Sequence, residues 1–199
     1  MSKALAEGGV TAAEITFTVP DAVEVIRQVR RVVGDAIVLG AGTVLDPETA
    51  RTAMLAGAEY IVSPIVNLEV IRHCRRYDAV VMPGAFTPTE VLTAWETGVD
   101  VVKVFPADVG GPAFLRALRG PLPQVRLMPT GGVDLTTAEG PSSRRAPAAW
   151  GSAGRSWNPK RSPPATSPAF ASLLASMRRS SPEFARPGDF LPLLALSLL

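Results

Sequence analysis

A regular alternation of two patterns over residues 1–138 is the feature that most limits the possible folds. Short apolar runs, most of them rich in β-branched residues, end near Gly, Pro, Ser or Thr, and stretches with helical spacing separate them. The apolar runs are Ala13–Phe17, Ile37–Leu39, Tyr60–Val62, Val80–Met82, Val101–Phe105 and Val125–Met128; the helical stretches are 21–33, 47–56, 67–76, 88–97 and 112–118. This alternation predicts a parallel sheet covered by helices.

The ends of the helical stretches carry their own signals. Asp or Thr beside Pro suits the cap and first turn of a helix, and Gly favours its end. Such starts occur at Pro20-Asp21, Asp46-Pro47 and Thr87-Pro88, and such ends at Gly34, Gly57 and Gly98.

Small or polar residues lie on or directly after each apolar run. They are Glu14-Ile-Thr16, Gly40-Ala-Gly-Thr43, Ser63-Pro64, Pro83-Gly84, Pro106-Ala107 and Pro129-Thr-Gly-Gly132. In a TIM-type (β/α)8 barrel the active site is built at this end of the strands. Six such units favour an α/β fold of this barrel type over an open doubly wound sheet. No G-x-G-x-x-G opens the first unit, so a dinucleotide-binding fold gains no support.

The scarcity of cysteine and histidine excludes several kinds of site. Cys74 and His73 are the only residues of their types, which excludes a disulfide framework and a cysteine or histidine metal cluster and disfavours a Ser-His-Asp triad. No signal peptide opens the chain, and the apolar run 190–199 is too short to span a bilayer. We therefore expect a cytoplasmic protein with no metal, no cofactor and no membrane partner.

Lys103 is the strongest candidate for chemistry among only three lysines. It lies within Val101-Val-Lys-Val-Phe105, and burial in such a strand lowers the pKa of an amine and makes it a nucleophile toward ketones. The alternative is a structural lysine at a sheet edge, or one paired with Glu14 or Asp108.

Glu14 has the same character, because carboxylates are seldom buried without a partner. It is either a general acid/base beside Lys103 or a counter-charge. Thr130-Gly131-Gly132 is either an anion-binding turn or an ordinary tight turn. Thr43 either binds a carboxylate or caps the following helix.

Six motifs in order resemble one enzyme family. They are Glu14-Ile-Thr16, Gly40-Ala-Gly-Thr-Val44, Ile61-Val-Ser-Pro64, Met82-Pro-Gly84, Val102-Lys-Val-Phe-Pro-Ala107 and Met128-Pro-Thr-Gly-Gly-Val133. Together they resemble the 2-keto-3-deoxy-6-phosphogluconate and 4-hydroxy-2-oxoglutarate aldolases over residues 3–138. The resemblance implies a metal-free, homotrimeric (β/α)8 barrel that splits a 2-keto-4-hydroxy acid into pyruvate and an aldehyde.

The resemblance also implies roles for individual residues. Lys103 would form a Schiff base with the keto group, and Glu14 would relay protons. The substrate would be held by Thr43, Pro64 and Thr130 at the pyruvate end, by Phe105 beside the lysine, and by Gly131 and Gly132 at the distal phosphate or carboxylate. Thr18 stands where many members carry an arginine, which places the preferred substrate in doubt.

The two ends of the chain depart from the family pattern. The resemblance implies a helix and a first barrel strand before the segment that corresponds to residues 1–9, and we expect this strand to be missing here. Residues 139–199 contain no Val or Ile, are rich in Ser and Pro, and are basic. Read one nucleotide back, 149–169 can encode a peptide resembling the family's eighth strand and glycine-rich phosphate loop. We therefore predict a barrel portion over 1–138, and a frameshifted or disordered tail over 139–199 in place of strand eight.

Three other functions compete with an aldolase. An inactive remnant or interaction protein of the same family fits the departures at both ends. A phosphosugar epimerase would use Thr130-Gly-Gly132, but such enzymes generally need acid/base pairs or metal ligands. Nucleic-acid binding rests only on the charge of the tail, and the frameshift hypothesis removes that support.

Overall fold

The computed structural model describes residues 12–131, in which strands and helices alternate as expected. The strands are β1 (Ala12–Thr16), β2 (Val38–Gly42), β3 (Tyr60–Val62), β4 (Val80–Met82), β5 (Gly84–Ala85), β6 (Val102–Val104) and β7 (Leu127–Pro129). The helices are α2 (Ala22–Val33), η1 (Gly34–Ala36), α3 (Pro47–Ala56), α4 (Leu68–Arg76), α5 (Pro88–Glu96) and α6 (Ala107–Arg119). The six predicted strands are confirmed to within about three residues, the largest difference being at the end of β2, and the two-residue β5 was not predicted.

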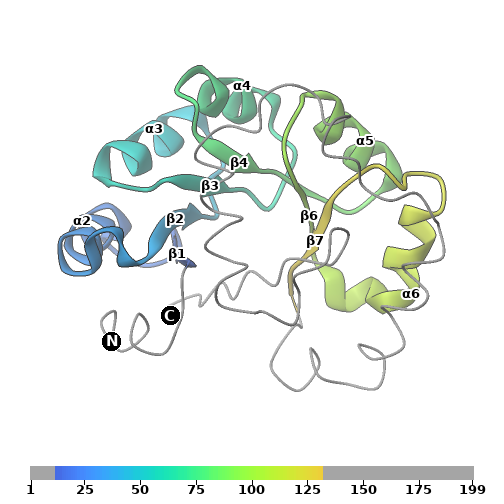
Figure 1. The fold of residues 1–199 in the computed structure, drawn as a ribbon, viewed down its shortest axis with the longest axis horizontal. Helices are drawn as coiled ribbons and strands as arrows, with labels where there is room; N and C mark the ends of the chain where they lie inside the picture. The colour runs from blue at the N-terminus through green and yellow to red at the C-terminus, as the bar shows by residue number, and fades with distance from the viewer. Residues whose placement is uncertain (1–11, 132–199) are drawn as a thin grey trace.

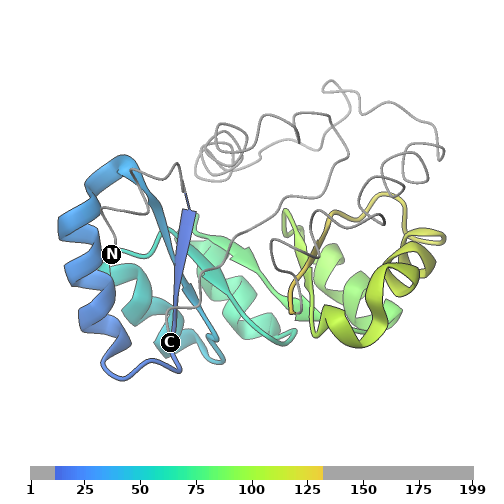
Figure 2. The ribbon, with the colours of Figure 1, turned by 90° about the horizontal axis from the view of Figure 1, so that it is seen from below.

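All strand pairs are parallel, and their order in space follows their order in the chain. One sheet runs β1-β2-β3-β4 and the other β5-β6-β7, with Pro83 between β4 and β5. The helices follow one another along the outside of a curved row of strands (Figure 1). Seen from below, α2 lies at one end of this row and α6 at the other (Figure 2). In a doubly wound sheet the strand order reverses at one point, whereas here it follows the chain throughout. This topology is that of the TIM-type α/β barrel.

The predicted helix boundaries are largely correct. Asp46 caps α3 by accepting a hydrogen bond from the Thr49 N–H at 2.6 Å, and Thr87 forms a capping box with Glu90 on α5. Asp21 occupies the cap position of α2, but its side chain makes no capping hydrogen bond. Gly34 and Gly57 end α2 and α3, as predicted.

Helix α6 begins earlier than the sequence pattern indicates. Its first residue is Ala107, whereas the pattern predicts a start at residue 112. Gly111, with φ 61° and ψ −170°, interrupts the helix just before Pro112. The predicted stretch is therefore the second of two helical segments joined at this kink, because proline suits the first turn of a helix.

The strand residues divide into two buried layers. Residues such as Ile15, Leu39 and Val102 pack with the helices in one cluster. The alternate residues, including Tyr60, Met82 and Met128, form a second cluster on the opposite face. Side chains alternate between the faces of a strand, so the second cluster fills the inside of the curved row.

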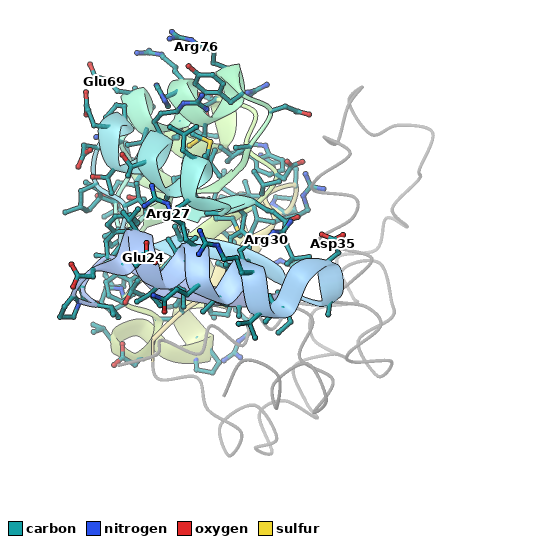
Figure 3. All side chains as sticks on the ribbon, turned by 90° about the vertical axis from the view of Figure 1, so that its left-hand side faces the viewer. Glu24, Arg27, Arg30, Asp35, Glu69 and Arg76 are labelled. Carbon is teal, nitrogen blue, oxygen red and sulfur yellow. The ribbon has the colours of Figure 1, made fainter. Side chains whose placement is uncertain are left out.

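Charged side chains lie mainly on the outer helices. Glu24, Arg27, Arg30 and Asp35 extend over the outer side of α2 and η1 (Figure 3). Arg30 lies 2.7 Å from a carboxylate oxygen of Glu59 and 3.4 Å from one of Asp35. Among the described residues, the buried charged side chains are those of Glu14 and Lys103, and both lie on strands.

No helix among residues 12–131 is long and apolar enough to cross a membrane. Several predictions concern residues outside this range. They are the missing first strand, the division near residue 138, the frameshifted tail with its eighth strand, and the role of Gly132.

Candidate active site

Lys103 lies at the centre of β6 and is 8% exposed. Its neighbours Val102 and Val104 pack in the helix-facing layer, so the lysine belongs to the inner face. Its Nζ lies 4.9 Å from the centroid of the Phe105 ring. The strand thus holds a single amine inside the barrel beside an aromatic ring.

Burial makes Lys103 a better nucleophile than an ordinary lysine. Desolvation lowers the pKa of the Lys103 amine, and the nearby charge of Glu14 offsets part of that change. A lowered pKa increases the fraction of neutral amine near pH 7, which is the form that attacks a carbonyl carbon.

Glu14 lies on β1 and is 4% exposed. Burial raises the pKa of its carboxyl group, and the charge of Lys103 partly offsets this effect. Its carboxylate lies over Gly42 of β2, where any Cβ would overlap with Oε1. The charges of Glu14 and Lys103 therefore act on one another although the two residues lie in different sheets. This is possible because the row of strands curves.

The residues after β2 and β3 lie at the same end of the strands. Thr43 is half-buried and has a left-handed backbone, with φ 57°. Pro64 follows β3, and its carbonyl group passes so close to Gly84 that a Cβ there would overlap with it. Only a glycine allows the backbone after β3 and the backbone at the start of β5 to approach this closely.

A second group of predicted residues gathers at the ends of β6 and β7. The Ala107 N–H donates to the Thr130 carbonyl at 2.9 Å, and the Thr130 N–H donates to Val104 at 3.0 Å. Gly131 has φ 96°, and a Cβ there would lie 3.7 Å from Cδ2 of Phe105. Thr130, Gly131 and Phe105 are therefore neighbours at this end of the strands.

A cavity of about 260 Å³ opens at this end of the barrel. Pro64 and Phe105, both predicted to bind substrate, belong to its lining. The remaining lining residues are Ile65, Val66, Gly84, Ala85, Phe86 and Glu90. Most of its lining side chains are apolar, but polar and apolar atoms contribute similar areas to its surface. The carboxylate of Glu90 accepts hydrogen bonds from the backbone at the start of α5.

Tyr60 is a buried residue near Glu14 that was not identified from the sequence as part of the site. Tyr60 is 1% exposed on the inner face, and its hydroxyl donates to the Ala13 carbonyl at 2.9 Å. The hydroxyls of Thr16 and Thr18 lie 2.7 Å apart. A tyrosine at the start of an apolar run gives no signal of its own, because the same pattern describes an ordinary core residue.

The chemistry available here is that of a buried amine and a buried carboxyl group whose charges act on one another. Among the described residues, no group of three His, Cys, Asp or Glu side chains could hold a metal ion. The arrangement supports nucleophilic attack by Lys103 on a carbonyl carbon, with proton transfer by Glu14.

Known proteins share this sequence and fold. The family described as KDPG and KHG aldolase matches residues 1–156. The chain is 43% identical over 136 residues to 2-dehydro-3-deoxy-phosphogluconate aldolase of Treponema pallidum (strain Nichols), covering 68% of this chain and 64% of that protein. It is 38% identical over 134 residues to KHG/KDPG aldolase of Escherichia coli (strain K12), covering 67% and 62%.

A solved structure gives the same result. KDPG aldolase from Legionella pneumophila, with pyruvate captured at low pH as a covalent carbinolamine intermediate, matches with a TM-score of 0.62 and 28% identity. The match covers 66% of this chain and 65% of that one. The chain therefore spans slightly less than two thirds of the length of these relatives. These matches confirm the resemblance predicted from the six motifs, and the chain belongs to the KDPG and KHG aldolase family.

Proposed function

We propose that this protein is a class I aldolase that cleaves a 2-keto-4-hydroxy acid through a Schiff base on Lys103. The observation that carries the proposal is the buried amine of Lys103 on the inner face of a barrel strand, electrostatically coupled to the buried carboxyl group of Glu14. Its place in the family supports the same chemistry.

The reaction begins at the neutral amine. Lys103 Nζ attacks the C2 keto carbon to form a carbinolamine, and loss of water gives a protonated imine. Glu14 removes the proton of the C4 hydroxyl, the C3–C4 bond breaks, and its electron pair moves into the imine to give an enamine while the aldehyde leaves. Protonation of C3 and hydrolysis of the imine release pyruvate and regenerate Lys103. The Legionella relative, which holds pyruvate as a carbinolamine, supports the first step.

The surrounding residues hold the substrate in this proposal. Thr43, Pro64 and Thr130 bind the pyruvate end, and Phe105 packs against the lysine side. Gly131 and Gly132 contribute backbone N–H groups to the distal phosphate or carboxylate. All of these except Gly132, which lies beyond the described residues, follow the carboxyl ends of strands.

The aldehyde product depends on the distal group of the substrate. Cleavage gives pyruvate with glyceraldehyde 3-phosphate from the phosphogluconate substrate, or pyruvate with glyoxylate from 4-hydroxy-2-oxoglutarate. Thr18 is exposed and supplies no positive charge where many members carry arginine. We propose that anionic substrates bind more weakly here than in members with that arginine, which a comparison of KM before and after Thr18→Arg measures.

Borohydride trapping tests the proposal directly. The full chain is incubated with pyruvate and sodium borohydride, and its peptides are mapped by mass spectrometry. We expect one reduced pyruvyl adduct, on Lys103, while Lys3 and Lys160 serve as internal controls. The variant Lys103→Arg keeps the positive charge and should give no adduct. A folded chain with an unmodified Lys103 would instead identify an inactive member of the family.

Assembly and location follow from the family resemblance. We propose a cytoplasmic homotrimer that binds a small keto acid and neither nucleic acid nor membrane. Light scattering of the purified chain measures the mass of the assembly, and a monomer would contradict this part of the proposal.

A further inference from the structure

Tyr60 crosses the inner face of the barrel from β3 to β1. Its register partner on β2 is Gly40, which also pairs with Glu14 on the other side. A Cβ on Gly40 would overlap with the Tyr60 ring, so the glycine leaves room for the ring to lie over β2. The Tyr60 hydroxyl then reaches the Ala13 carbonyl on β1 at 2.9 Å.

The ring lies on the same face of β2 as the carboxylate of Glu14. The carboxylate covers Gly42 and the ring covers Gly40, two residues earlier on the same face of β2. These positions are roughly 7 Å apart along a strand. The Tyr60 ring therefore covers β2 two residues before the position that the Glu14 carboxylate covers. Its hydroxyl donates to the carbonyl of the peptide group that joins Ala13 to Glu14.

The hydroxyl remains a neutral donor in this position. Complete burial, together with the nearby negative charge of Glu14, raises the pKa of Tyr60 well above its ordinary value. The hydroxyl adds a hydrogen bond across the inner face to a strand that is already paired with β2. The hydrogen bond thus restricts the movement of β1 at the point from which Glu14 extends.

We propose that Tyr60 is a positioning residue for Glu14, whose hydroxyl anchors β1 so that the carboxyl group stays over Gly42 and beside Lys103. The inference rests on the proposed function, because it assigns Glu14 a proton to move. Small displacements of a proton-transfer group cost large factors in rate, so the hydroxyl should matter for turnover more than for substrate capture.

Exchange of the methyl protons of pyruvate isolates the step in which Glu14 acts. In D2O, the imine on Lys103 loses a methyl proton to Glu14, and the resulting enamine takes a deuteron back at carbon. Hydrolysis of the imine releases deuterated pyruvate, which nuclear magnetic resonance follows over time. The borohydride adduct on Lys103 measures capture of pyruvate separately, in the same samples.

Tyr60→Phe removes one oxygen and keeps the ring. We expect exchange to fall roughly tenfold, while the amount of adduct at saturating pyruvate changes less than twofold. Tyr77→Phe is the matched control, because Tyr77 is the only other tyrosine and is 45% exposed. It should leave both readouts unchanged. The inference would be overturned if the exchange rate of Tyr60→Phe stayed within twofold of the rate of the unsubstituted chain.

A double-mutant cycle separates positioning from a general structural role. In the background Glu14→Gln, the further change Tyr60→Phe should alter exchange less than twofold, because the group that Tyr60 positions is gone. An additional tenfold loss in that background would contradict positioning through Glu14. If the unsubstituted chain shows neither the adduct nor the exchange, the proposed function is overturned as well. If the unsubstituted chain shows both and Tyr60→Phe exchanges at the same rate, only this inference is overturned.

Discussion

Two oppositely charged side chains buried inside one barrel are the main residue-scale feature of this protein. Burial lowers the pKa of Lys103 and raises the pKa of Glu14, and in both cases the other charge offsets part of the effect. Both groups are thereby shifted toward neutral forms, which suits an amine that must attack and a carboxyl group that must exchange protons.

The rate of adduct formation with pyruvate should depend on pH through Lys103. Because the pKa of Lys103 is lowered, the rate should rise with pH and level off below the pKa of an ordinary lysine, about 10.4. Glu14→Gln removes the charge that raises the pKa of Lys103, so the rise should move to lower pH. Time courses of borohydride trapping across pH measure both curves. A shift to higher pH in Glu14→Gln would show that the two charges do not interact as described.

Gly42→Ala should damage activity more than stability. The new methyl group would occupy the position of the Glu14 carboxylate, which lies at the end of a flexible side chain and can move aside. We expect a loss of under about 2 kcal/mol in the free energy of unfolding, but a loss of roughly tenfold or more in methyl exchange. Gly120→Ala is the control, because its Cβ would make only ordinary contact, at 3.4 Å. Unchanged exchange in Gly42→Ala would disprove the placement of the carboxylate.

At the scale of elements, a local sequence signal determines where α5 begins. Helix α5 starts with Thr87, whose hydroxyl accepts from the Glu90 N–H at 3.3 Å, while the Glu90 carboxylate accepts from the N–H of Thr87 at 2.8 Å. The same carboxylate accepts from Phe86 at 2.9 Å. Because Phe86 lines the cavity, the start of α5 also fixes one wall of the site.

Thr87→Ala should destabilise the protein without altering the chemistry of Lys103. Loss of a helix cap costs about 1 kcal/mol in the free energy of unfolding, which urea denaturation measures. The control is Thr93→Ala, an exposed position within the same helix, where alanine should be neutral or slightly stabilising. Equal losses in the two variants would show that the capping box contributes nothing.

At the scale of the whole molecule, curvature allows distant strands to act on one another. Glu14 lies on β1, the edge strand of one sheet, and Lys103 lies on β6, the middle strand of the other. Their charges interact only because the row of strands bends so that these inner faces approach. The stability of the barrel and the properties of the site are therefore linked across the fold.

Lys103→Met should destabilise the fold at neutral pH, because it leaves the Glu14 carboxylate buried without its counter-charge. Adding Glu14→Gln should recover at least half of that loss. The folded-state pKa of Glu14 is raised, so the loss should be present above that pKa and should disappear as pH falls through it. Thermal unfolding of the single and double variants across pH measures these changes. Additive losses in the double variant would show that the two groups are independent.

The sequence by itself determined the alternation of strands and helices, several of the helix caps and the unusual apolar setting of Lys103. These features are local, since they depend on residue types at fixed spacing along the chain. Only the tertiary structure decided that the charges of Glu14 and Lys103 act on one another, that Gly40 and Gly42 make room for Tyr60 and Glu14, and that α6 is kinked before Pro112. Such relations depend on which strands become neighbours and how the sheet bends. Interactions between residues as far apart in the chain as Ala13 and Tyr60, or Glu14 and Lys103, leave no periodic trace in a single sequence.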